Sequence, residues 1–125
     1  MKKYVMFCFF NVVCALAVGF GAYIILRNNT IINTFFQVNT PLSNSVIGFY
    51  LPDFLWAYAL CFTLAIFCKW IYAFIISSCF GVIWELLQKS GYLTGTFDYL
   101  DIIMYISASS IAVLLLLQFK RRERL

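Results

Sequence analysis

Long stretches without charged side chains constrain this sequence more than any other feature. Residues 4–26 contain no charged side chain, and further mainly apolar stretches follow at about 51–68, 70–88 and 99–119. A helix that crosses the hydrocarbon core of a membrane needs about 20 predominantly apolar residues. We therefore predict an all-α, multi-pass membrane protein, with four transmembrane helices in a single domain that covers residues 1–125.

The composition excludes the other classes of protein. Hydrophobic residues make up 64% of the chain and charged residues only 11%, whereas a soluble domain has about 25% charged residues. Disorder is excluded because it requires low hydrophobicity and high charge. The chain has no histidine, which excludes histidine-based catalysis and histidine-ligated metals.

The first apolar stretch also resembles a cleavable signal peptide, because Lys2 and Lys3 precede it. A signal peptide usually has an apolar region of only about 7–15 residues, which ends in a small-x-small site. Here the apolar stretch is longer, and Phe20 and Tyr23 stand near its end. We therefore expect an uncleaved span. Small residues on one side of it suit close packing within the bundle: Ala15, Gly19 and Ala22.

A polar and aromatic connection, residues 27–50, is predicted to lie on the outer side of the membrane. Four of its apolar residues share one helical face, which indicates a short helix in the membrane interface: Ile31, Ile32, Phe35 and Phe36. Pro52 and Asp53 are expected to begin the second spanning helix. Proline suits the first helical turn, and an acidic side chain suits the positive end of the helix dipole.

The boundary between the second and third spans has no obvious turn residue. No glycine, proline or asparagine occurs between Asp53 and Ser77. A single helix from Pro52 to Gln88 would be about 55 Å long, against a hydrocarbon core of ~30 Å. We therefore predict a tight hairpin near Lys69. A second turn is predicted at residues 90–96, where glycines accompany serine and threonine.

Basic residues predict the orientation of the four spans. If both termini lie on one side, seven basic residues share that side: Lys2, Lys3, Lys69, Lys120, Arg121, Arg122 and Arg124. The other side has only Arg27 and Lys89. Because basic residues concentrate on the cytoplasmic side, we predict that both termini are cytoplasmic. The basic C-terminal residues are interpreted as this orientation signal, and no nucleic-acid partner is expected.

Glu123 belongs to the inner C-terminal tail, and the other four acidic residues gather at the opposite, outer ends of the helices: Asp53, Glu85, Asp98 and Asp101. Glu85 and Gln88 are three residues apart and share a helix face, as do Asp98 and Asp101. A carboxylate inside an apolar stretch, such as that of Glu85, normally faces the bundle interior or a water-filled cavity. We therefore predict an outward-facing ligand pocket lined by Glu85, Gln88, Asp98 and Asp101, with Asp53 nearby.

The same residues also have structural interpretations, which stay open at this point. Glu85 could hydrogen-bond neighbouring hydroxyl groups, and Asp98 and Asp101 could cap the last helix. Small or hydroxylated residues continue each helix face, which predicts close packing of the last two helices: Gly81 and Ser78 on one, Tyr105, Ala108 and Ala112 on the other. The cysteines show no CxxC spacing and are expected to be small core residues: Cys8, Cys14, Cys61, Cys68 and Cys79.

Two motifs carry a resemblance to a known family. Glu-Leu-Leu-Gln at 85–88, followed by Gly-Thr-Phe-Asp-Tyr-Leu-Asp at 95–101, resembles the VanZ-like family of small bacterial membrane proteins. In that family, Glu-x-x-Gln ends one span and Asp-x-x-Asp opens the last. The resemblance covers the C-terminal third and reaches the second span through Asp53 and Tyr58. It implies a role at the bacterial cell envelope, in the cytoplasmic (inner) membrane.

The chain also departs from the family pattern. The family commonly has Lys and His near the start of the second span, where this chain has Phe54 and Ala57. It commonly has Asn and Gly after the second Asp, where this chain has Tyr105 and Ala108. The family's named example is associated with resistance to the glycopeptide antibiotic teicoplanin.

Three functional hypotheses follow. The first is a VanZ-like envelope protein whose acidic pocket binds a lipid headgroup or lipopeptide, with membrane lipids as partners. The second is a transporter or channel for cations or small molecules, which would need a homo-oligomer with acidic rings. However, no charged residue lies at the predicted midplane, where transporter sites usually lie. An enzyme with paired carboxylates is the third, and no nucleophile supports it. No cofactor is expected, and a metal stays an open question.

Overall fold

Four long helices make up the part of the chain that the structure describes. The computed structural model describes residues 2–26 and 46–123, which form helices and turns without any strand. The helices are α1 (Lys2–Leu26), α3 (Val46–Phe67), α4 (Trp70–Lys89) and α5 (Tyr99–Arg122). Each is long and apolar enough to cross a membrane. The prediction of an all-helical chain with four helices of spanning length is therefore confirmed.

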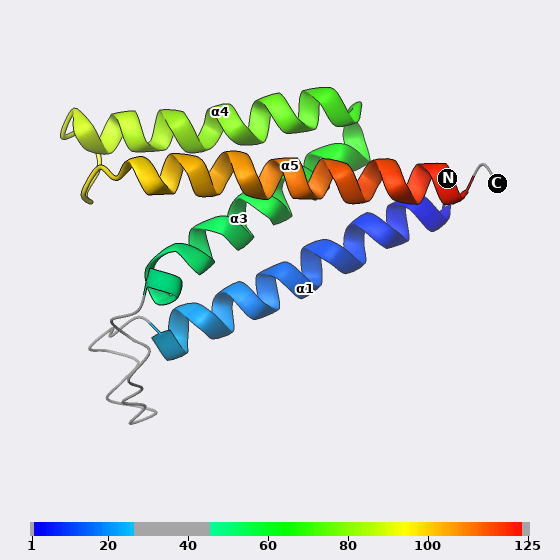
Figure 1. Cartoon of the computed structure of the whole chain (residues 1–125), viewed down its shortest axis with the longest axis horizontal. Helices are drawn as coiled ribbons and strands as arrows, with labels where there is room; N and C mark the ends of the chain where they lie inside the picture. Colours follow the sequence, from blue (N-terminus) through cyan, green and yellow to red (C-terminus); the bar gives the residue numbers. More distant parts are fainter. Residues whose placement is uncertain (1, 27–45, 124–125) are drawn as a thin grey trace.

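The helices form two pairs (Figure 1): α4 with α5, which we call the closed pair, and α1 with α3, which we call the splayed pair because it is tilted away from the closed pair. Figure 1 shows α4 and α5 running antiparallel along their whole length, while α3 crosses α5 obliquely and α1 diverges from it. Both ends of the described chain meet at one end of the bundle, which we call the termini end. There the ammonium nitrogen of Lys3 lies 3.7 Å from the Glu123 carboxylate, and the rings of Phe7 and Phe119 stack at 4.3 Å. The opposite end carries the α4–α5 turn, and we call it the turn end.

The start of α3 differs from the sequence prediction. Pro52 was expected to begin this helix, and that prediction is wrong, because α3 begins at Val46, within the predicted connection 27–50. Pro52 lies buried inside the helix. A proline there removes one backbone donor, which membrane helices tolerate because neighbouring groups satisfy the freed carbonyl. The predicted interfacial helix lies outside the described residues: Ile31, Ile32, Phe35 and Phe36.

The predicted hairpin near Lys69 is confirmed. α3 ends at Phe67 and α4 begins at Trp70, so only two residues form the connection. Lys69 has an extended backbone (φ −65°, ψ 146°), which any residue adopts readily. The Cys68 amide donates to the Leu64 carbonyl oxygen at 2.9 Å and closes the end of α3. The turn therefore needs no glycine, which is why the sequence around it has no turn signal.

Small residues of α1 pack against α3. Ala15 is buried, and a Cβ atom added to Gly19 would lie 3.3 Å from the Cβ atom of Leu55. These residues therefore serve packing within the chain, as expected for their spacing.

The cysteines separate into core and surface residues. Cys8 and Cys61 are fully buried, in a cluster with Phe62 and Leu116. Cys14 and Cys79 are exposed, so the prediction that all five belong to the core is wrong for these two. All five carry free thiols. A small, weakly polar thiol suits a lipid-facing surface as well as a core, and sequence alone does not distinguish the two.

Candidate functional site

The interface between α4 and α5 is closed by small residues. Buried residues recur at every fourth position of α4: Ala73, Ser77, Gly81 and Glu85. A Cβ atom added to Gly81 would lie 2.3 Å from Cγ of Tyr105, so α4 touches the Tyr105 side chain directly. The hydroxyl oxygens of Ser77 and Ser109 lie 2.8 Å apart.

Close packing of these two helices is therefore confirmed, with one change. On α4 the fully buried serine below Gly81 is Ser77, while Ser78, which was predicted for this face, is half-buried with its hydroxyl oxygen shielded from solvent. Ser77 is four residues from Gly81 and Ser78 is three, and both spacings place residues on neighbouring parts of one helix face. The crossing of α4 and α5, which sequence spacing does not reveal, decides that Ser77 meets Ser109.

Glu85 is buried at the turn end and binds the start of α5. Only 1% of its surface is exposed. One of its carboxylate oxygens, Oε2, accepts a hydrogen bond from the Asp98 backbone amide at 3.2 Å. This contact joins the last turn of α4 to the residue that precedes α5. The predicted bonding partner, a neighbouring hydroxyl, is thus replaced by a backbone amide.

Asp98 joins three helices. Its Oδ1 accepts from the Leu100 amide at 2.9 Å, so it caps α5 as the structural interpretation predicted. Its Oδ2 accepts from the Tyr50 hydroxyl of α3 at 2.5 Å. The Tyr50 hydroxyl and then the Leu100 amide hold the pKa of Asp98 below its usual value, since both stabilise the ionised carboxylate.

Gln88 holds the turn between α4 and α5. With its amide oriented to suit its neighbours, the nitrogen donates to the Thr96 carbonyl oxygen at 3.3 Å and the oxygen accepts from the Trp84 indole N–H at 3.1 Å. Gly95 makes this approach possible, because a Cβ atom there would lie 2.6 Å from the side-chain amide group of Gln88. Gly95 also has φ +142°, a conformation that favours glycine. Three of the five predicted ligand residues, Glu85, Gln88 and Asp98, therefore contact this turn.

Asp53 lies elsewhere, on a cavity between the splayed and closed helix pairs. The cavity has a volume of about 580 Å³ and is lined by residues of all four helices. We call it the interhelical cavity, and its lining residues are Val12, Leu16, Asp53, Trp56, Ala57, Ala59, Leu60, Thr63, Ser77, Phe80, Gly81, Trp84 and Tyr105. Glu85, Gln88, Asp98 and Asp101 are not among them.

Tyr105 lies between the two groups of predicted residues. It is 8% exposed and lines the interhelical cavity. The carboxyl groups of Asp53, Glu85 and Asp101 lie in the neighbourhood of its hydroxyl. The predicted single pocket is therefore two adjoining places in the structure, the α4–α5 turn and the interhelical cavity, with Tyr105 at their boundary.

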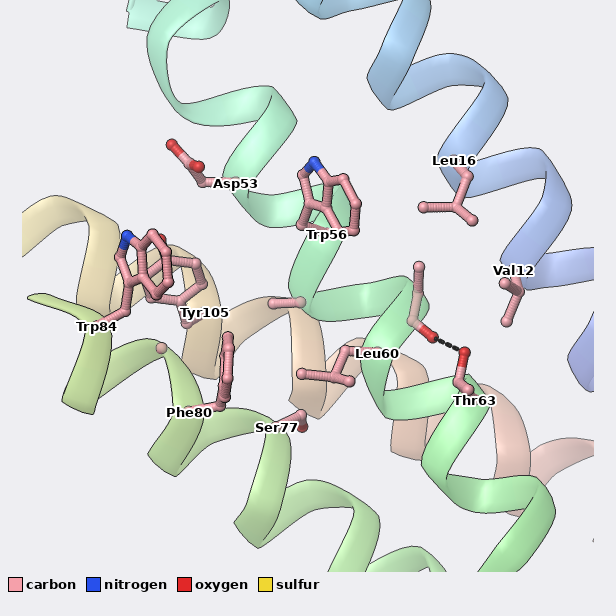
Figure 2. A pocket seen from close by; sticks show the side chains of 13 residues that line it. Val12, Leu16, Asp53, Trp56, Leu60, Thr63, Ser77, Phe80, Trp84 and Tyr105 are labelled. Carbon is pink, nitrogen blue, oxygen red and sulfur yellow. Dashed lines mark hydrogen bonds between the residues drawn. The ribbon is translucent and has the colours of Figure 1, made fainter. Parts of the chain in front are cut away.

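Figure 2 shows how the cavity is built. Asp53, Trp56, Trp84 and Tyr105 gather at one end of it, while Ser77 and Thr63 lie farther along α4 and α3. Trp56 is 64% exposed and Trp84 is 42% exposed, so this end of the cavity has aromatic walls at the molecular surface.

The aromatic lining of the cavity was not predicted from the sequence. Tryptophans are common at membrane interfaces whether or not a ligand site is present, so they gave no separate signal. On α3 a signal was present, because Asp53, Trp56, Leu60 and Thr63 recur at helical spacing. That Trp84 and Tyr105 face the same space depends on how the helices cross.

In residues 2–26 and 46–123, no three His, Cys, Asp or Glu side chains come close enough together to hold a metal ion.

Comparison of the whole chain with protein-family models, curated proteins and solved structures produced no match. The resemblance to the VanZ-like family therefore depends on the motifs at 85–88 and 95–101.

Proposed function

We propose that this chain is a VanZ-like integral membrane protein of the bacterial cytoplasmic membrane, which binds a lipid headgroup or lipopeptide of the cell envelope. The observation that carries the proposal is the interhelical cavity of about 580 Å³, with Asp53 at its turn end. In this proposal both termini lie in the cytoplasm, and the turn end faces outward.

The distribution of basic residues supports this orientation. The termini end carries six of the described basic residues: Lys2, Lys3, Lys69, Lys120, Arg121 and Arg122. Among the described residues, the turn end carries Lys89. Basic residues concentrate on the cytoplasmic side of membrane proteins. A green fluorescent protein fused to the C-terminus should therefore fluoresce, and an alkaline phosphatase fused there should be inactive.

The cavity itself supports an amphiphilic ligand. Its volume lies within the range of about 300–1,000 Å³ that is usual for small-molecule sites, which are mostly apolar with a few placed polar groups. Its walls belong to helices of spanning length, so a ligand that enters from the membrane must be apolar over most of its length. Asp53 supplies a charged group at one end.

Native mass spectrometry of the purified full chain, extracted in maltoside from bacterial membranes, tests the proposal. We expect the wild-type chain to retain a lipid or lipopeptide, and Asp53→Asn to retain much less. Glu123→Gln is the control, because it removes a carboxylate at the termini end. The proposal would be contradicted if the wild-type chain retained no such molecule, or if Asp53→Asn retained as much of it as the wild type.

A transport assay separates this function from the alternative of an oligomeric cation pathway. The chain is reconstituted in vesicles that contain a magnesium-sensitive dye. We expect no flux above that of protein-free vesicles. Flux that Asp53→Asn or Glu85→Gln abolishes would establish the transporter or channel hypothesis in place of ours.

A further inference from the structure

We propose that the interhelical cavity selects a single-chain amphiphile with an ammonium headgroup. The ammonium group lies between the Asp53 carboxylate and the indole rings of Trp56 and Trp84, and the hydrocarbon chain lies along Leu60 and Phe80. This inference depends on the proposed function in one respect, that the cavity is the ligand site. It adds the chemical class of the ligand and the role of the aromatic walls beside Asp53.

The acidic residues at the turn end differ in position, since Glu85 and Asp98 belong to the α4–α5 turn and do not line the cavity. Asp53 is the one charged side chain among the described residues that line the cavity. A carboxylate among apolar walls attracts a cation more strongly than one in water does, because the effective dielectric constant is lower. The charge of the lining therefore selects a cationic headgroup.

The aromatic walls complement the same charge. Cations bind over the face of tryptophan within about 6 Å of the ring centre, and aromatic side chains recognise quaternary ammonium groups in this way. Trp56 and Trp84 lie near Asp53 at one end of the cavity (Figure 2). A carboxylate with neighbouring indole rings is thus suited to an alkylammonium group.

The position of the Trp84 ring is set by its neighbours on α4. Its indole N–H donates to the Gln88 side-chain oxygen at 3.1 Å, and its ring stacks on Phe80 with centroids 6.2 Å apart. Gln88 in turn is held by the Thr96 carbonyl oxygen. The turn residues therefore act on this site as positioning residues, through Trp84.

The rest of the cavity is suited to hydrocarbon. Of the three hydroxyl groups that line the cavity, those of Thr63 and Ser77 lie in this part and already have partners, since Thr63 donates to the Ala59 carbonyl oxygen at 2.8 Å and the Ser77 oxygen lies 2.8 Å from that of Ser109. An apolar chain can therefore cover them without leaving a buried polar group unpaired. The cavity has the size of a site for one drug-sized molecule, so we propose one chain with its headgroup.

Tryptophan quenching by brominated amphiphiles tests the inference. The full chain in maltoside micelles is titrated with a bromododecyl trimethylammonium salt, with the corresponding sulfate and with the corresponding alcohol. A Trp70→Phe background removes the indole at the termini end. We expect saturable quenching by the ammonium probe alone, and an affinity lower by about tenfold or more in Asp53→Asn, as for loss of a partner in a buried charge pair.

Two further variants examine the walls. Trp56→Leu leaves Trp84 as the fluorescent reporter. It should lower the affinity for the ammonium probe severalfold without creating affinity for the alcohol probe. Thr63→Phe fills the hydrocarbon part and should abolish saturable quenching. Ala17→Phe adds the same ring to an exposed position of α1 and should leave binding unchanged. If Asp53→Asn fails to fold, as judged by circular dichroism, Trp56→Leu tests the ammonium site in its place.

The outcomes distinguish this inference from the proposed function. Equal affinity for ammonium and sulfate probes, or an unchanged affinity in both Asp53→Asn and Trp56→Leu, would overturn the ammonium site. If the wild-type chain retains a native lipid in mass spectrometry and Asp53→Asn retains much less, the proposed function survives that result. If no probe quenches saturably and no molecule is retained, both fail.

Discussion

The interface between α4 and α5 and the space between α1, α3 and α4 show two ways of joining membrane helices. In the first, Gly81 lets α4 contact Tyr105 directly, and Ser77 bonds Ser109 across the gap. In the second, α3 and α4 meet in a short hairpin and then leave a cavity of about 580 Å³. The difference comes from residue size, since small residues allow close helix contact and bulky ones such as Trp56 and Trp84 do not.

Polar groups follow the same division. At the closed interface, Glu85, Gln88 and Asp98 have partners in the turn that joins the two helices. On the open side, between α1, α3 and α4, Asp53 lines a space large enough for a ligand. The closed pair thus stabilises the bundle, and the open side is where binding is expected. The following substitutions test this division, from the largest expected effect to the smallest.

Gly81→Leu should destabilise the protein most. A side chain there meets Tyr105 at its Cβ and Cγ atoms, which cannot move away without shifting α5. Overpacking typically costs about 1–3 kcal/mol and occasionally more, and we expect a loss at the upper end, measured by thermal unfolding in detergent. Gly21→Leu is the control, because nothing lies within 4 Å of a Cβ atom at Gly21. Equal losses in both would refute a specially close α4–α5 contact.

Glu85→Ala should rank second. It leaves the Asp98 amide without its acceptor, and an unpaired donor in a partly buried site costs about 1–3 kcal/mol. Glu85→Gln keeps an acceptor oxygen and should lose less. Unfolding in increasing dodecyl sulfate measures stability, and hydrogen exchange at the Asp98 amide should accelerate in the alanine variant. An unchanged exchange rate would mean that Glu85 does not hold the turn.

Gly95→Ala should have a smaller effect than these two, of about 1 kcal/mol or somewhat more, because its backbone conformation disfavours a side chain and its Cβ atom would press on Gln88. Gly91→Ala is a matched control, with φ +80° but open space around its Cβ atom. The difference between the two variants contains the contact with Gln88 together with the less favourable backbone conformation of Gly95. In the Gly95 variant the fluorescence of Trp84 should also change, and a change of equal size in Gly91→Ala would count against that contact.

Thr63→Phe, on the open side, should be nearly neutral, with a change within about 0.5 kcal/mol. The cavity has room for the ring, and the Thr63 hydroxyl bonds only a carbonyl of its own helix among the contacts described. Thermal unfolding measured beside Gly81→Leu gives the comparison directly. A loss as large as that of Gly81→Leu would mean that the open side is as tightly packed as the closed one.

The weakest expected effect concerns pH. Because the folded state lowers the pKa of Asp98 below its usual 3.8, the ionised carboxylate contributes stability at higher pH. That contribution is complete above the unfolded pKa and is lost as pH falls through the folded pKa. Tyr50→Phe removes the Tyr50 hydroxyl, which lowers the pKa of Asp98 more than the Leu100 amide does, and should bring that pKa back toward 3.8. Carboxyl NMR titration measures it, and an unshifted pKa would show that the Tyr50 contact is not formed in solution.

Much of the fold could be predicted from the sequence because each helix is specified locally. Apolar stretches of spanning length predicted all four helices, and the excess length of residues 52–88 predicted the hairpin. The start of α3 was missed because proline suits a helix start as well as a membrane helix interior. Capping by Asp98 was also predicted, since a cap involves only the next few residues.

The candidate site was predicted less completely, because it depends on contacts between distant residues. Sequence spacing placed Glu85 and Gln88 on one face of α4, and placed Asp53 at the same end of the bundle. It could not separate the carboxylate that binds the turn from the one that lines a cavity. Nor could it show that Trp56 and Trp84, which are far apart in the chain, would face the same space.

The sequence by itself determined that the chain forms helices suited to a membrane and that four of its five acidic residues gather at one end. Hydrophobic length and charge determine these properties, and both are local features of the chain. Only the tertiary structure decided which acidic residue lines a cavity and which stabilises a turn. That choice depends on how α3 crosses α5 and on how closely Gly81 lets α4 approach Tyr105, because helix packing is the sum of many small contacts between residues far apart in the chain.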